Sequence, residues 1–245
     1  MLTKRVPTSY AEFMRTDGGD DPSGRERRVV GLGVGLALTA ALAQSALHLV
    51  NLAFFDLEIN AINVDSDSGA FTWASSVATF GAALAIVQLW LLVGRGRPDL
   101  WMPAVAGVLA FFSLDDLLFI HERISALENE FAGIEHFSRL FWPLVFMPLL
   151  GASFVGLWVL TMRMRPLAAT AVRAGLALLV AAILMEMASP ALFALGFDHG
   201  DLGYELETVA EEGAELAGWM LVATGLVAAV FREAAALGRA ARGPA

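Results

Sequence analysis

The stretch from residue 109 to residue 124 reads LAFFSLDDLLFIHERI, and it sets charged groups inside an otherwise apolar segment. The interrupting residues are Asp115, Asp116, His121 and Glu122. An ionisable group inside a bilayer costs about 2.5–3.5 kcal/mol on insertion scales, so such groups are rare and tend to mark functional sites. The stretch therefore predicts a membrane-spanning helix that carries part of a site.

The composition of the whole chain is typical of a membrane protein. Of its 245 residues, 57% are hydrophobic and only 17% are charged, and the mean hydropathy is +0.64. Soluble domains contain about 45–50% apolar and about 25% charged residues. The formal net charge of −9 argues against a nucleic acid partner, which requires a basic face. The chain has no cysteine, which excludes disulfides, zinc–thiolate sites and iron–sulfur clusters.

Six segments are long and apolar enough to span a bilayer, which takes about 20 residues. They cover residues 29–52, 69–93, 100–120, 141–162, 168–195 and 204–231. Pro190 is expected to kink or end the fifth helix near its outer end. The pattern predicts an all-α fold, a polytopic bundle of six transmembrane helices that occupies residues 29–232.

The distribution of basic residues predicts the orientation of this bundle. All of the 16 basic residues except Arg123 and Arg139 fall on one side of it. The positive-inside rule then places both termini in the cytoplasm. Residues 1–28 are polar and charged and are expected to form a disordered cytoplasmic tail, and residues 233–245 a second tail. We therefore expect a multi-pass protein of a bacterial cytoplasmic membrane whose first partner is the lipid bilayer.

Polar residues on several predicted helices are expected to meet at one depth. A helix rises about 1.5 Å per residue, which places His48, Asp115 and Glu212 about 27–30 Å from the nearest basic residue at a cytoplasmic helix end. Glu186 and Glu215 fall in the same layer. We expect a pocket between the first, third, fifth and sixth helices, open to the outer side and covered by the loop at residues 55–70.

The start of the sixth predicted helix is rich in carboxylates. Glu207, Glu211 and Glu215 share one stripe at a spacing of four residues, and Glu212 flanks it. Like charges at this spacing repel, so the stripe requires a cation, shared protons or arginine partners. Two arginines on that side of the membrane cannot neutralise so many acids. Glu205 and Glu207 lie in the first turns, where acids favour the helix dipole, and are not assigned to the site.

Three motifs extend over most of the predicted membrane region: FDLEIN with the downstream TWASS, then SLDDLLFIHER, then EEGAELAGW. Together they resemble an uncharacterised family of small polytopic bacterial membrane proteins. The positions that carry the resemblance are Phe55, Asp56, Leu57, Glu58, Asn60, Thr72, Trp73, Ser75, Ser76, Ser113, Leu114, Asp115, Asp116, His121, Glu122, Glu211, Glu212 and Glu215. The resemblance implies the helical architecture and the site, and it names no reaction. A longer insert at residues 61–70 departs from the family pattern.

The first functional hypothesis is a metal site. Its expected ligands are Asp115, His121, Glu122, Glu212 and Glu215, with Glu122 and Glu212 as candidate catalytic groups. The residues expected to support these ligands are His48, Asp116, Glu186 and Glu211. Mixed carboxylate and imidazole ligands suit a divalent metal ion such as Zn, Fe or Mn. A metal with an open coordination position would allow hydrolysis of a lipid-like substrate.

Two other hypotheses stay open. Carboxylate and histidine chains also mark proton or cation pathways in transporters, although the inner halves of the spans contain almost no ionisable residue. A third possibility is a non-catalytic structural or partner-binding membrane subunit. The sequence does not decide whether the protein is an enzyme, and it does not fix the oligomeric state.

Overall fold

The computed structural model of the chain describes residues 22–66, 69–93, 100–118, 120 and 138–241. Within these residues all regular structure is helical and no strand occurs, which confirms the all-α prediction. The helices are α2 (Pro22–Phe55), the short 3₁₀ helix η1 (Asn60–Ile62), α3 (Ala70–Val93), α4 (Trp101–Leu118), α6 (Ser138–Thr161), α7 (Pro166–Ala194) and α8 (Leu202–Ala240).

Five of these helices are long and apolar enough to cross a membrane, which supports a membrane-embedded protein. The five candidate spans are Ser23–Phe55, Ala70–Val93, Trp101–Leu118, Pro166–Ala194 and Leu202–Ala240. The apolar part of α6, Phe146–Thr161, is shorter than these five spans. The sixth span therefore stays a prediction.

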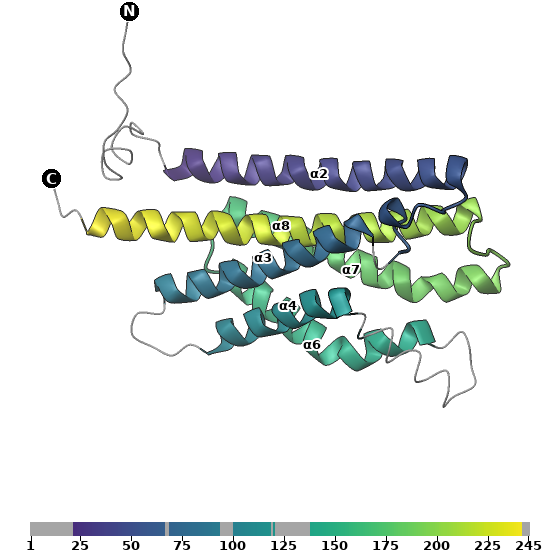
Figure 1. Cartoon of the computed structure of the whole chain (residues 1–245). Coiled ribbons are helices and arrows are strands. Elements are labelled where there is room, and N and C mark those ends of the chain that lie inside the picture. The colour runs from purple at the N-terminus through teal and green to yellow at the C-terminus, as the bar shows by residue number, and fades with distance from the viewer. Residues whose placement is uncertain (1–21, 67–68, 94–99, 119, 121–137, 242–245) are drawn as a thin grey trace, which may run out of the picture.

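The helices run roughly along one common axis, and α2 starts at the same end of the bundle at which α8 finishes (Figure 1). α2 lies at the periphery, where Leu32, Leu36 and Leu42 are between 62% and 70% exposed. Leucines on such a face suit contact with lipid chains. α8 packs against α2, α3 and α7 and is the central helix of the described bundle.

Small residues bring α7 and α8 close together. A Cβ atom added to Gly175 would lie 2.5 Å from the carbonyl oxygen of Gly218, and one added to Gly225 would lie 2.6 Å from that of Ala168. Glycines at such positions let two membrane helices approach backbone to backbone. Fully buried aliphatic side chains then fill the space among α3, α4, α6, α7 and α8: Ile86, Leu109, Leu157, Val172, Val222 and Leu226.

Two helices extend beyond their predicted ends, and Pro190 does not end a third helix. α2 already begins at Pro22, because a proline is well tolerated in the first turn and no later proline interrupts the segment. α7 continues past Pro190 to Ala194. α8 continues beyond the predicted end at residue 231 to Ala240, through an alanine-rich stretch of high helix propensity. Residues 1–21 and 242–245 of the predicted tails lie outside the described residues.

Candidate functional site

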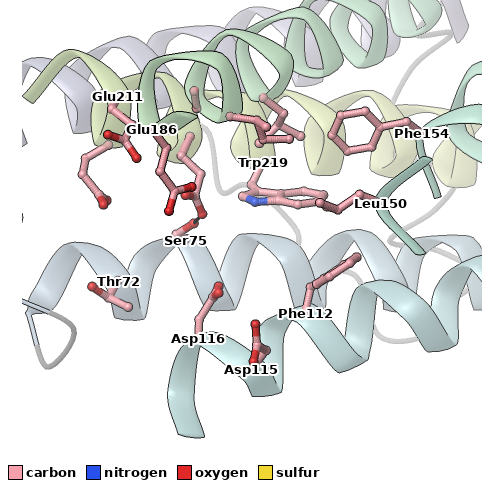
Figure 2. A pocket seen from close by; sticks show the side chains of 15 residues that line it. Thr72, Ser75, Phe112, Asp115, Asp116, Leu150, Phe154, Glu186, Glu211 and Trp219 are labelled. Carbon is pink, nitrogen blue, oxygen red and sulfur yellow. Dashed lines mark hydrogen bonds between the residues drawn. The ribbon is translucent and has the colours of Figure 1, made fainter. Parts of the chain in front are cut away.

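A cavity of about 150 Å³ lies among α3, α4, α6, α7 and α8. Six carboxylates from three helices line it: Asp115 and Asp116 from α4, Glu186 from α7, and Glu211, Glu212 and Glu215 from α8. In Figure 2 the acids of α7 and α8 lie across the cavity from the two aspartates of α4. The helices thus bring together acidic residues that are far apart in the sequence.

Serine side chains on α3 and α4 hold part of this arrangement in place. The Ser75 hydroxyl donates a hydrogen bond of 2.9 Å to Oε1 of Glu215, and the Ser76 hydroxyl donates one of 3.4 Å to Oδ2 of Asp116. Ser113 donates to the backbone oxygen of Ser76 at 2.9 Å and ties α4 to α3. The two serines of the TWASS motif therefore orient two of the carboxylates, and the serine of the SLDD motif joins two of the helices.

Carboxylates are crowded around the cavity. Glu212 interacts electrostatically with Glu215, Glu211 and Glu186, and also with Asp65 of the loop between α2 and α3. None of the described residues that line the cavity is basic. Repulsion among so many carboxylates has to be balanced by protons, cations or arginines.

The other wall of the cavity is apolar. Phe112, Leu150, Phe154 and Trp219 gather at the end away from Thr72 and Glu211 (Figure 2). Trp219 is only 6% exposed, and its indole nitrogen lies on the side of the ring that faces the carboxylates. No described residue accepts a hydrogen bond from this indole N–H. The cavity therefore offers a polar end, an apolar end and one hydrogen-bond donor between them.

His48 does not line the cavity, and its supporting role stays a prediction. It is fully buried on α2, with Nε2 2.7 Å from Oε2 of Glu205. Because Nδ1 accepts a hydrogen bond of 3.2 Å from the Val64 N–H, Nε2 carries the proton that is donated to Glu205. The Gly200 N–H donates to the other oxygen of Glu205 at 2.8 Å.

The helices that line the pocket differ from the expected ones. The pocket does not involve α2, the first predicted helix, and it includes α3 and α6. The loop between α2 and α3 nevertheless lies close to it. The Thr72 hydroxyl, at the cavity, donates to the backbone oxygen of Ser66 at 3.3 Å. The Asp65 carboxylate, which interacts with Glu212, lies 3.5 Å from Nδ1 of His199 in the loop before α8.

Sequence reasoning missed Glu205 and the apolar wall. Glu205 was interpreted as a dipole-stabilising acid at a helix start, whereas it is 1% exposed and is the partner of His48. The estimated depth of His48 was the sequence signal that could have revealed Glu205, because a buried histidine requires a polar partner at the same height in the bundle. Phe112, Phe154 and Trp219 gave no signal, since aromatic residues in apolar helices usually serve packing.

Metal binding is not supported by the described part of the chain. Two of the predicted ligands, His121 and Glu122, lie outside the described residues. Asp115, Glu212 and Glu215 do line the cavity. The described residues contain no group of three or more histidines, aspartates or glutamates arranged to hold a metal ion.

The fold and the cavity define an α-helical membrane protein with an acidic cavity inside its bundle. Residues 31–230 match a family described as "Domain of unknown function (DUF8692)", and the chain belongs to this family. The match confirms that the resemblance is to an uncharacterised family, while the motifs assigned to it and its bacterial origin stay predictions. No curated protein and no solved structure matches the chain significantly.

Proposed function

We propose that this protein is a six-span protein of a bacterial cytoplasmic membrane, with both termini inside, whose cavity binds a cation from the outer side. The observation that carries the proposal is the convergence of six carboxylates from α4, α7 and α8 on one cavity. Negative groups around a cavity of low dielectric concentrate cations and bind them strongly.

A cation site explains this arrangement better than a structural role does. Acids that only cap helices or form surface ion pairs have no need to face a common cavity. Here hydrogen bonds from Ser75 and Ser76 orient Glu215 and Asp116, which line the cavity. The described carboxylates are spread around the cavity and form no compact ligand group. This distribution favours a hydrated or organic cation over a tightly coordinated transition metal.

Binding is a better description than transport for this state of the protein. Leu179 precedes Glu186 on α7, and Trp219 follows Glu215 on α8, so both lie nearer the end where α2 starts. The cavity lining therefore becomes apolar toward the proposed cytoplasmic side. Metal-dependent hydrolysis of a lipid-like substrate depends on His121 and Glu122 and stays a prediction, since no described geometry carries it.

The test is cation binding by the purified protein in lipid nanodiscs, measured by calorimetry with sodium, calcium, manganese, zinc and alkylammonium salts. We expect at least one cation to bind the wild type and to lose its affinity in a Glu212→Gln, Glu215→Gln double variant. Glu58→Gln, which removes an exposed glutamate of the neighbouring loop, is the matched control and should bind as the wild type does. Equal binding by the double variant, or no binding of any cation, would refute the proposal.

A further inference from the structure

The two ends of the cavity differ in the ligand chemistry that they suit. An inorganic cation would use only the carboxylate end. It would leave the wall of Phe112, Leu150 and Phe154 facing water, which is unfavourable by about 25 cal/mol for each Å² of apolar surface. An organic cation uses both ends, because its charge lies among the carboxylates and its hydrocarbon part against the apolar wall.

Trp219 adds an independent observation that points to a ligand. Its side chain is 6% exposed and lines the cavity, and its indole N–H has no acceptor among the described residues. The indole nitrogen lies at the surface of the cavity, where an acceptor on a ligand can reach it. The nitrogen faces the carboxylate end (Figure 2), so a ligand acceptor that binds it lies beside the cationic group.

The volume of the cavity indicates the size of a ligand that it can enclose. The cavity measures about 150 Å³. An engineered protein cavity of about 150 Å³ binds benzene, so a ligand of about six to eight non-hydrogen atoms is the appropriate size. A lipid with complete acyl chains is far too large to be enclosed.

We propose that the ligand is a small organic ammonium ion with an oxygen acceptor next to the charged nitrogen and a short hydrocarbon end. This inference rests on the proposed cation site and names its ligand class. The ammonium N–H groups donate to carboxylates such as Glu212 and Glu215. The oxygen accepts the hydrogen bond from Trp219, and the hydrocarbon end packs against Phe112 and Phe154.

Three probes of equal size separate these contributions: 2-amino-1-pentanol, 3-aminohexane, which has a methyl group in place of the hydroxyl, and 2-methyl-1-pentanol, which has a methyl group in place of the amine. Binding is measured by calorimetry in nanodiscs of phosphatidylglycerol, whose headgroup carries no ammonium group. We expect the amino alcohol to bind about two- to tenfold more tightly than 3-aminohexane, the usual contribution of one hydrogen bond. The uncharged alcohol should not bind.

A Trp219→Phe variant tests the hydrogen bond directly, because it removes the indole N–H and keeps an aromatic ring. The preference for the amino alcohol over 3-aminohexane should disappear, while 3-aminohexane binds about as tightly as before. A purely structural role of Trp219 would weaken both ligands equally. Trp158→Phe, which changes a half-exposed tryptophan farther along α6, is the control and should keep the preference.

The outcomes separate this inference from the proposed function. Equal affinity of the wild type for the amino alcohol and for 3-aminohexane would overturn the assignment of the ligand class. Binding of inorganic cations alone would also overturn it, while the cation site would stand. Failure of every cation to bind would overturn both.

Discussion

Replacing Glu205 by alanine should destabilise the protein more than any other single removal of a described carboxylate. Glu205 is 1% exposed, and its two oxygens accept hydrogen bonds from His48 at 2.7 Å and from the Gly200 N–H at 2.8 Å. Alanine leaves both donors buried without this acceptor. Each unsatisfied buried donor costs about 1–3 kcal/mol, and we expect Glu205→Ala, which leaves two of them, to lower the free energy of unfolding by about 2–6 kcal/mol.

Glu205→Gln gives a graded comparison because it keeps the shape of the side chain. Its single carbonyl oxygen can accept from only one of the two donors. The amide NH₂ group then faces the other of these two donors and cannot accept from it. The His48 ring cannot change tautomer to relieve this, because Nδ1 would then lose its hydrogen bond from the Val64 N–H. One unsatisfied donor costs about 1–3 kcal/mol, so the glutamine variant should lie between the wild type and Glu205→Ala.

Equilibrium unfolding in mixed micelles, followed by circular dichroism, measures these free energies. A double-mutant cycle of His48→Ala and Glu205→Ala isolates the interaction of the pair, and we expect a coupling of about 0.5–3 kcal/mol. Glu58→Ala, at an exposed position, is the control and should unfold like the wild type. Strict additivity of the two single variants, or a glutamine variant as unstable as the alanine variant, would refute the reasoning.

Three further predictions concern the cavity, the packing and the orientation of the bundle. Glu212→Gln should raise the melting temperature of the ligand-free protein by a few degrees, because it removes the desolvation of a buried carboxylate and the repulsion from Glu215, Glu211 and Glu186. An unchanged or lowered value would contradict this reasoning. Gly175→Val should cost about 1–3 kcal/mol of stability through overpacking, whereas Gly31→Val, with open space around it, should be nearly neutral in the same unfolding assay. Because the chain lacks cysteine, single Glu58→Cys and Arg239→Cys variants can be labelled in intact cells with a membrane-impermeant maleimide. Only Glu58→Cys should react, because the proposed topology places it outside the cell. Labelling of Arg239→Cys instead would reverse that topology.

The helices could be predicted from the sequence because a span needs only length and apolar composition, which are local properties. The grouping of Asp115, Glu186 and Glu212 followed from height along the bundle, since a fixed rise per residue converts position in the chain into depth. These three residues do line one cavity.

The position of His48 could not be obtained in the same way. Height does not fix the direction in which a helix faces, and α2 packs against a different side of α8 from the one that lines the cavity. His48 therefore lies at the expected level and binds Glu205 instead of the cavity acids. The apolar wall could not be predicted for another reason. Phe154 and Trp219 have the same sequence pattern whether they fill a core or face a ligand.

In the loop between α2 and α3, the neighbouring residues Val64 and Asp65 connect the His48–Glu205 pair with the cavity. The backbone of Val64 is held by His48, and the next residue, Asp65, is exposed while its charge reaches Glu212. A cation that approaches from this side is attracted by Asp65 before it meets the buried acids. Exposed charges near a binding site act chiefly on the association rate, and ionic strength weakens their effect. For the proposed cation site, the His48 contact, which makes no contribution to the cavity wall, is therefore expected to influence the association rate.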